Sequence, residues 1–340
     1  MSRFASRDHA AAFTAARAAE ALKLEGRVLV AHDPLPVLAG TLSDLGCAPV
    51  VWQRRLAATG RGEHPSPLPP DGIFEHGFYR LPTAWDEFLL SMQQIAAQIA
   101  PGGGLIVYGA NDEGIKSAAR RLPPAFGPAQ TCLVKNHCRV IALSPEPMEA
   151  PSLKGALAAV QSIVGERTVR FMTLPGLFAH GRLDAGTKLL IETAEALAPP
   201  EEGATIIDYG CGGGALLSWA KTAAPSSQRV GIDIDSLAGI ALAETDPAAR
   251  FVLAGRLADG DVPPADLLLS NPPIHAGKAQ HFGVVEALLA DLDAGLTRAG
   301  RALIVVQSTV PLARWTPSGF AATAIASTPS FTVWQLARTR

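Results

Sequence analysis

The amino-acid sequence predicts an α/β protein made of two tandem doubly wound units. In residues 151–340, short apolar runs of strand length alternate with helical patterns, which is typical of a mostly parallel sheet. Residues 1–150 repeat this alternation less clearly. Between them, residues 144–152 (SPEPMEAPS) are rich in Pro and Glu and suit a linker better than the interior of an element. We therefore expect one domain at 1–150 and a second at 151–340.

Composition limits the class of protein. The chain has 340 residues, 48% of them hydrophobic, and a formal net charge of -2, which fits a soluble globular protein with room for two cores. No run of 18 apolar residues is present, so we expect no membrane span and a cytoplasmic location. The 4 cysteines form no CxxC pair and the 8 histidines no HExxH motif, so no metal is expected. We expect a monomer.

The expected elements follow one another in a regular order along both halves. An Ala-rich amphipathic helix opens the chain, and strand-like runs separated by helices follow it. In the first half these are GRVLVA (26–31), a helix at 35–45, APVVW (48–52), GIFEHGFYRLP (72–82), a helix at 84–99, GGGLIVYGAND (102–112), a helix at 113–121 and TCLVKNHCRVIAL (131–143). In the second half they are GATIIDYG (203–210), ALLSWAKTAA (215–224), RVGIDID (229–235), ARFVLAG (249–255), ADLLLSN (265–271), a helix at 282–296, RALIVVQS (301–308) and FTVWQLAR (331–338).

A glycine-rich turn follows the first strand of the second half. Its glycines permit positive φ, and the helix that follows offers unpaired N–H groups to an oxygen-rich ligand. Gly210-x-Gly212-x-x-Ala215 satisfies the dinucleotide fingerprint, with Asp233 placed for a ribose hydroxyl. Asp208, however, would repel a pyrophosphate and attract an ammonium group. S-adenosylmethionine (SAM) has an ammonium group, a ribose and no phosphate, so it fits better than a dinucleotide; a purely structural turn is the remaining alternative.

A second polar turn ends the strand at 265–270. Asn271 is followed by Pro272 and Pro273, which a central strand cannot continue through. If the sheet is doubly wound, this turn lies beside the glycine turn at the carboxyl edge, where ligands bind. The Asn271 amide oxygen and the Pro272 carbonyl are two acceptors, which match the two hydrogens of an exocyclic amino group. The alternative is an Asn-Pro turn that only ends the strand.

These motifs resemble those of a known family. DYGCGGG (208–214), GIDID (231–235) and SNPPIHAG (270–277) are similar to class I SAM-dependent methyltransferases with an NPP[FY] motif, which modify exocyclic amino groups. LPGLFAHGRLDAGTKLL (174–190) and VYGANDEGIKSA (107–118) resemble segments of the ribosomal RNA guanine-N2 methyltransferases of the methyltransferase C type, which act on the small ribosomal subunit, and of their large-subunit relatives. The resemblance thus covers both halves of the chain.

The resemblance implies two tandem Rossmann-like methyltransferase domains, of which the N-terminal one is degenerate and engages RNA. It implies SAM as the cofactor and ribosomal RNA or a ribosomal subunit as the partner. The residues that would bind SAM are Asp208, Gly210, Gly212, Gly214 and Asp233, with Ala254 and Gly255 near the adenine, Leu183, Asp184 and Thr187 at the methionine end, and Asn271 facing the methyl group. The catalytic turn would comprise Asn271, Pro272, Pro273, Ile274 and His275.

Two features of the sequence bear on the substrate. Ile274 stands where the family usually has an aromatic residue that stacks on a flipped base. His275 could take over this role or could cap the turn. Lys278 is the basic residue that we expect to contact RNA; other candidates, for which an ordinary exposed surface is the alternative, are Arg54, Arg55, Arg120, Arg121, Lys135, Arg139, Arg167 and Arg170.

The sequence therefore predicts a SAM-dependent N-methyltransferase that acts on guanine N2 of ribosomal RNA of the 16S type. One alternative is methylation of another amino group, on adenine N6 or on a protein glutamine. A second is a protein that binds SAM and RNA in assembly without catalysis, which Ile274 makes conceivable. A dehydrogenase is opposed by Asp208 and by the Asn-Pro-Pro turn.

Overall fold

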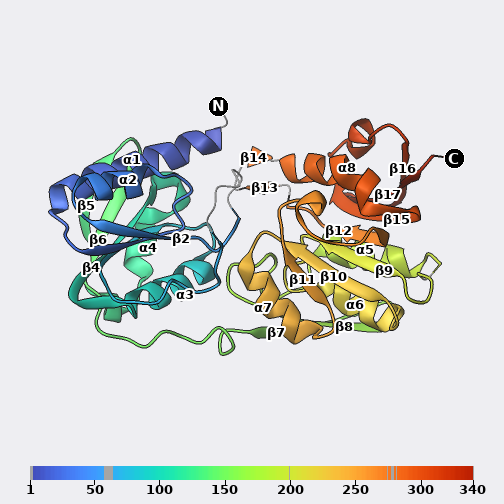
Figure 1. The fold of residues 1–340 in the computed structure, drawn as a ribbon, viewed down its shortest axis with the longest axis horizontal. Helices are drawn as coiled ribbons and strands as arrows, with labels where there is room; N and C mark the ends of the chain where they lie inside the picture. The colour runs from blue at the N-terminus through green and yellow to red at the C-terminus, as the bar shows by residue number, and fades with distance from the viewer. Residues whose placement is uncertain are drawn as a thin grey trace. The chain divides into compact units, whose positions relative to one another are not determined.

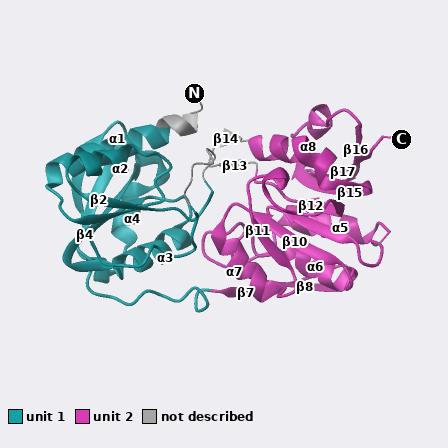
Figure 2. Ribbon diagram, viewed as in Figure 1, with its two compact units in different colours: residues 1–156 teal, residues 157–340 magenta. Residues whose placement is uncertain are grey.

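The computed structural model describes residues 3–56, 64–198, 200–273, 275–276, 279–280 and 282–339. The chain forms two compact units, Met1–Ala156 and Leu157–Arg340 (Figure 2). The segment between β6 (Cys138–Leu143) and β7 (Ala158–Val164), which includes the Pro- and Glu-rich stretch, contains no helix or strand.

Unit 1 is a mixed six-stranded sheet in the order β2-β1-β3-β4-β6-β5 (Figure 1). The first four strands in this order pair in parallel. At one edge β6 pairs antiparallel with β4, and β5 pairs antiparallel with β6. The strands are β1 (Arg27–Ala31), β2 (Ala48–Trp52), β3 (Phe74–Arg80), β4 (Ile99–Ala110), β5 (Gln130–Lys135) and β6. The helices are α1 (Arg3–Leu22), α2 (Val37–Asp44), α3 (Trp85–Ala96) and α4 (Ile115–Arg121), with short 3₁₀ turns η1 (Asn111–Glu113) and η2 (Pro124–Phe126).

Alternation along β1 divides the core of unit 1 into two layers. Val28 and Val30 face α1 and α2, whereas Leu29 and Ala31 face α3 and α4. All four side chains are buried, because helices cover both faces of the sheet, as in other mostly parallel sheets. The layers are visible in Figure 1, where α1 and α2 lie on one side of the strands and α3 on the other.

Unit 2 has a seven-stranded sheet in the order β11-β10-β9-β12-β15-β17-β16. Its strands are β9 (Thr205–Tyr209), β10 (Gln228–Asp233), β11 (Arg250–Leu253), β12 (Ala265–Ser270), β15 (Leu296–Gln307), β16 (Phe320–Ser327) and β17 (Phe331–Arg338), the last two antiparallel. The helices are α5 (Ala185–Glu195), α6 (Ala215–Ala223), α7 (Ser236–Thr245) and α8 (Gly283–Gly295), with η3 (Leu257–Asp259) and η4 (Leu312–Trp315). Two hairpins lie outside this sheet: β7 with β8 (Arg167–Thr173), and β13 (His275–Ala276) with β14 (Ala279–Gln280).

The two sheets share one strand order. Position by position, β2-β1-β3-β4-β6-β5 of unit 1 matches β10-β9-β12-β15-β17-β16 of unit 2, which adds β11 at the far edge. The fold class predicted from the sequence, two tandem doubly wound units, is therefore confirmed. The hairpin β7–β8, helix α5 and strand β16 were not predicted.

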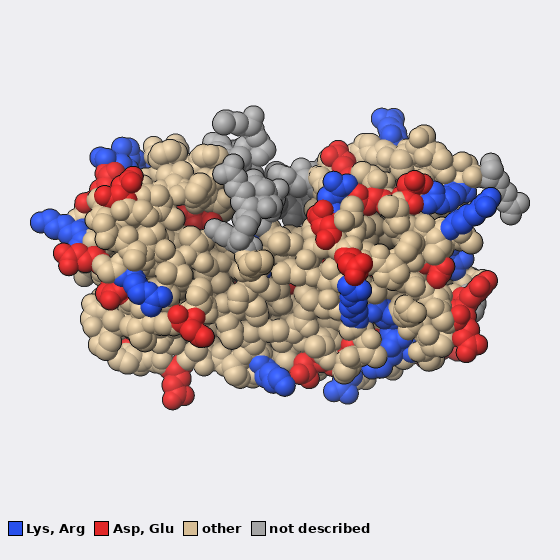
Figure 3. Space-filling view, viewed as in Figure 1, with Lys and Arg blue, Asp and Glu red and all other residues tan. Residues whose placement is uncertain are grey.

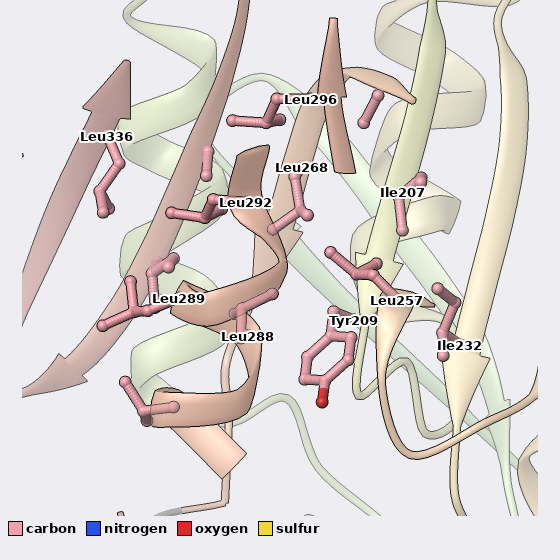
Figure 4. Packing of buried hydrophobic residues seen from close by; sticks show 14 of the residues in the cluster. Ile207, Tyr209, Ile232, Leu257, Leu268, Leu288, Leu289, Leu292, Leu296 and Leu336 are labelled. Carbon is pink, nitrogen blue, oxygen red and sulfur yellow. The ribbon is translucent and has the colours of Figure 1, made fainter. Parts of the chain in front are cut away.

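The core of unit 2 surrounds β9 on both sides. Every residue of β9 is buried, because α8 packs on one face through Leu288, Leu289 and Leu292 (Figure 4) and α6 packs on the other. Burial on both faces favours a continuous apolar run, and Asp208 interrupts this run one residue before the strand ends. A buried carboxylate in such a strand requires a specific explanation.

No helix in the described part of the chain is long and apolar enough to cross a bilayer. Among the same residues, no group of three His, Cys, Asp or Glu side chains is arranged to hold a metal ion.

Candidate functional site

A pocket in unit 2 lies where β9 and β12 end, between the glycine turn and the start of α5. It brings together seven of the residues predicted from the sequence, which come from three separate segments of the chain. These residues are Leu183, Asp184, Thr187, Asp208, Gly210, Gly212 and Asn271. Gly214, Asp233, Ala254 and Gly255 do not line this pocket within the described residues.

The glycines of the turn have different roles. Gly210, Gly212 and Gly214 all have positive φ, of 80°, 49° and 81°. A Cβ added at Gly210 or Gly212 would meet no atom within 4 Å, so these two leave open space beside the backbone. At Gly214 it would lie 2.6 Å from Leu242, so this glycine allows α6 to approach α7. The open side of the turn, at Gly210 and Gly212, is where a ligand can approach the backbone.

Asp208 presents a buried carboxylate to this space. Its side chain is 1% exposed, and its Oδ1 has no hydrogen-bond partner among the described residues. Burial, and secondarily the negative charge of Asp233, raises the pKa of the Asp208 carboxyl well above its usual range. An orphaned carboxylate oxygen at a pocket wall is suited to a cationic group, which would supply the missing hydrogen bond.

Asp233 holds the glycine turn in shape. Its Oδ2 accepts a hydrogen bond from Gly212 N at 2.8 Å, and its Oδ1 accepts one from Asp235 N at 2.9 Å. The same strand end binds the turn through its backbone, since Gly210 N donates to the Ile232 carbonyl at 2.8 Å. The sequence placed Asp233 opposite a ribose, and that contact stays a prediction; its bond to the turn was not anticipated.

The segment expected near an adenine is held in place by Tyr209. Its hydroxyl donates to the Gly255 carbonyl at 2.6 Å, and Ala254 N donates to the Asp233 carbonyl at 3.0 Å. A Cβ at Gly255 would meet only Ile234, at 3.7 Å. The backbone at Ala254 and Gly255 is thus ordered next to open space on one side.

Asn271 is oriented by two acceptors at the start of α5. Its Nδ2 donates to Asp184 Oδ2 at 3.0 Å and to Thr187 Oγ1 at 2.9 Å. Asp184 is also the N-cap of α5, where the same Oδ2 accepts from Gly186 N at 2.8 Å. Both hydrogens of the Asn271 amide are thus used within the protein, and its oxygen, an acceptor, accepts no hydrogen bond from the part of the chain described.

The rest of the Asn-Pro-Pro turn is only partly described. Pro272 is buried and Pro273 is exposed. The backbone of His275 belongs to β13, while its side chain, Ile274 and Lys278 lie outside the described residues. Ser270, which precedes the turn, donates through its hydroxyl to the Tyr209 carbonyl at 2.7 Å and so ties the ends of β12 and β9 together.

Several residues that line the pocket were not predicted as site residues from the sequence. Phe171, Phe178 and Arg182 also line the pocket, and Arg182 brings a positive charge to the same pocket as Asp208 and Asp184. Phe171 lies in the unpredicted strand β8, whose apolar alternation was visible but was not used. Phe178 and Arg182 lie in the segment 174–190, which was singled out only for Leu183 to Thr187.

Several basic residues proposed for phosphate contacts are already used by the fold. Arg54 is 2% exposed and forms an ion pair with Glu87 at 2.9 Å, so the interpretation of Arg54 as a phosphate ligand is wrong. Arg121 lies over the Trp85 ring at 3.9 Å. Arg55 and Arg167 pair with acidic side chains, while Arg120, Lys135 and Arg170 are exposed. In Figure 3, basic side chains stand among acidic ones over the face shown.

The fold and the pocket together define a methyltransferase: a doubly wound sheet with an acidic residue and a glycine turn after its first strand, next to an Asn-Pro-Pro turn. Residues 168–335 match the family model of the methyltransferase small domain. The chain is 31% identical over 295 residues to the ribosomal RNA small subunit methyltransferase C of Stutzerimonas stutzeri, covering 83% of this chain and 86% of the relative. The chain belongs to the ribosomal RNA small subunit methyltransferase C family.

Two further comparisons cover nearly the whole chain. The ribosomal RNA small subunit methyltransferase C of Hahella chejuensis is 28% identical over 307 residues, which cover 86% of this chain and 88% of that protein. The T. thermophilus 16S rRNA N2 G1207 methyltransferase, solved in complex with AdoMet and guanosine, is 23% identical, with a TM-score of 0.77 over 93% of this chain and 89% of its own. The shared fold therefore includes both units.

Proposed function

We propose that this protein uses SAM to methylate the N2 amino group of a guanine in ribosomal RNA, with all of the chemistry in unit 2. The observation that carries the proposal is the orientation of Asn271. Asp184 and Thr187 take both hydrogens of its amide, so the group that Asn271 has left for a ligand is its oxygen, an acceptor. An acceptor at this position suits an amino group as the substrate and is poorly suited to a carbonyl or a phosphate oxygen.

The pocket suits the amino-acid end of SAM. Asp208 can pair with the ammonium group through its orphaned Oδ1, and Arg182 can pair with the carboxylate. The open backbone at Gly210 and Gly212 allows the rest of the molecule to pass along the turn toward Asp233 and Gly255. When bound, SAM would supply an electrophilic methyl group on a sulfonium, with a neutral thioether as the leaving group.

The chain's own residues would act by positioning. The Asn271 oxygen and the Pro272 carbonyl would hold the two hydrogens of the guanine amino group and so aim its lone pair. Pro272 and Pro273 stiffen the backbone that carries this carbonyl. No side chain needs to act as a base, because the methylated amine can release its proton to solvent.

Unit 1 is proposed to be degenerate as a methyltransferase domain. His32 follows β1 as Gly210 follows β9: each has positive φ, 56° and 80°, and each donates its N–H to the neighbouring strand at 2.8 Å. The His32 ring packs 4.4 Å from the Trp52 ring and 5.4 Å from the Tyr79 ring, between centroids. An imidazole thus stands in unit 1 where the turn of unit 2 leaves open space.

The test is to incubate the protein with labelled SAM and ribosomal subunits that lack the modification, and to identify the labelled nucleoside. N2-methylguanosine is expected. Label in adenosine or in a ribosomal protein would point to a different amino group, and SAM binding without transfer would indicate an assembly protein. A ribosomal substrate would place the protein in the cytoplasm, and sedimentation will test the expected monomer.

A further inference from the structure

Phe178 is an exposed aromatic residue at the wall of the pocket. It is 59% exposed, yet it lines the same pocket as Asn271 and Asp208. A single exposed apolar ring is common on protein surfaces, but a ring at the wall of a pocket is placed to contact a bound ligand.

The exposure of Phe178 is imposed by its neighbours. Leu174 and Leu177, just before it, are 0% and 6% exposed and anchor the segment in the core. Ala179, just after it, has a positive φ of 53°, which is uncommon for a residue with a Cβ and turns the chain sharply. Asp184 then fixes the start of α5. The ring is therefore presented from a segment that is anchored on both sides.

The acceptor turn lacks a ring of its own in the expected place. Ile274 offers an aliphatic surface but no π face, and a base that is held only by its amino edge is free to rotate about that edge. A ring from another segment would remove this freedom. Phe178 is the exposed aromatic residue that the described pocket provides, since Phe171 is 5% exposed.

We propose that Phe178 stacks on the face of the target guanine while Asn271 and Pro272 hold its amino edge. This inference rests on the proposed function and adds the residue that recognises the base as a ring. The alternative occupant of the Phe178 face is the sulfonium end of SAM, since cations also bind to aromatic faces. The two differ in which ligand loses affinity when the ring is removed.

Two isothermal titrations decide between guanine and SAM as the ligand of Phe178. In one, guanosine is titrated into the protein in the presence of S-adenosylhomocysteine; in the other, SAM is titrated alone. Phe178→Ala should weaken guanosine binding by about 5- to 150-fold, the range for one base stacked on one ring. Phe178→Leu should lose most of this affinity and Phe178→Trp should retain it, while SAM affinity stays within twofold. Phe13→Ala is the matched control, because Phe13 is 52% exposed on α1, in unit 1.

Unchanged guanosine affinity in Phe178→Ala, or a loss confined to SAM, would overturn the inference. If the wild type binds adenosine instead of guanosine and Phe178→Ala loses that affinity, the stacking role holds and the guanine assignment of the proposed function is wrong. If the wild type binds no nucleoside, both are wrong.

Discussion

The side-chain amide of Asn271 donates to the carboxylate of Asp184 over 3.0 Å, although the two residues are 87 positions apart. The same carboxylate oxygen accepts from Gly186 N and Thr187 N, which makes Asp184 the N-cap of α5. One oxygen thus fixes both the start of a helix and the direction of the acceptor amide. The orientation of Asn271 depends on the integrity of α5.

The first prediction separates these two roles of Asp184. Asp184→Ala removes the cap and should lower the free energy of unfolding by about 1 kcal/mol, in addition to lowering kcat. Thr187→Val removes one acceptor of Asn271 without touching the cap, so it should lower kcat by roughly 2- to 10-fold, as expected for one hydrogen bond, with little change in stability. Urea denaturation measures the free energy of unfolding, and steady-state methylation measures kcat. Equal effects of the two variants on stability would contradict the assignment.

The second prediction concerns Asn271 itself. Asn271→Ala should lower kcat by about 100-fold or more, because positioning of the amine is lost, while SAM affinity changes little. Asn271→Leu keeps the volume and also lacks the acceptor, so it should be equally inactive. Calorimetry with SAM provides the control on folding. An Asn271 variant that loses SAM binding and keeps turnover per bound SAM would assign the residue to the cofactor.

The third prediction concerns the charge of Asp208. Asp208→Asn should weaken SAM binding by roughly 10- to 150-fold, because a charge-assisted hydrogen bond contributes about 1.5–3 kcal/mol. Wild-type affinity should rise with pH as the buried carboxyl ionises, and the variant should lack this rise. Titrations with SAM across the acidic to neutral range measure both. NAD binding in place of SAM would refute the cofactor.

The same residue makes stability depend on pH. The pKa of Asp208 is raised in the folded chain above its ordinary 3.8 by burial, so folding favours the protonated acid. Ionisation therefore costs stability: the cost is absent below the unfolded pKa and grows as pH rises toward the folded pKa. Asp208→Asn should accordingly stabilise the ligand-free protein at neutral pH, with the gain shrinking toward pH about 4. A gain independent of pH would contradict the buried charge.

The fourth prediction concerns stoichiometry. The full chain should bind one SAM, and a fragment of residues 157–340 should bind one as well, because the pocket lies entirely within unit 2. The fragment should methylate ribosomal RNA poorly if unit 1 engages the substrate. Calorimetry gives the stoichiometry on soluble fragment. Two sites in the full chain would refute the degenerate assignment of unit 1.

Much of the fold could be predicted because strand signals in a parallel sheet are local. The strands TIIDY and ADLLLS are covered by helices on both faces, so apolar residues predominate in them and Asp208 stands out as a buried exception. The rule that ligands bind at the carboxyl edge then brought Asp208 and Asn271 together from sequence alone. Helix α5 was harder, because its capping residue Asp184 was interpreted as a ligand contact.

The sequence could not show which side chains from distant segments contact each other. Nothing local distinguishes Arg54, which is buried against Glu87, from Arg120, which is exposed. The exposure of Phe178 was equally hidden, since Phe in an apolar segment is usually buried. The burial of Arg54 and the exposure of Phe178 depend on tertiary packing, which cannot be read from local patterns in a single sequence.

The hairpin β7–β8 has a practical consequence for where this chain can be divided. The Thr245 hydroxyl accepts from Met172 N and lies 2.8 Å from the Gly213 carbonyl, so one side chain of α7 fastens the hairpin to the glycine turn. The match to the methyltransferase small domain starts at residue 168, inside β8. A fragment cut there would lack β7 and leave β8 as an unpaired strand beside the glycine turn. A fragment that keeps the β7–β8 hairpin therefore has to begin at the end of the linker, before Ala158, and we expect this hairpin to support the glycine turn, which follows α5 in the chain.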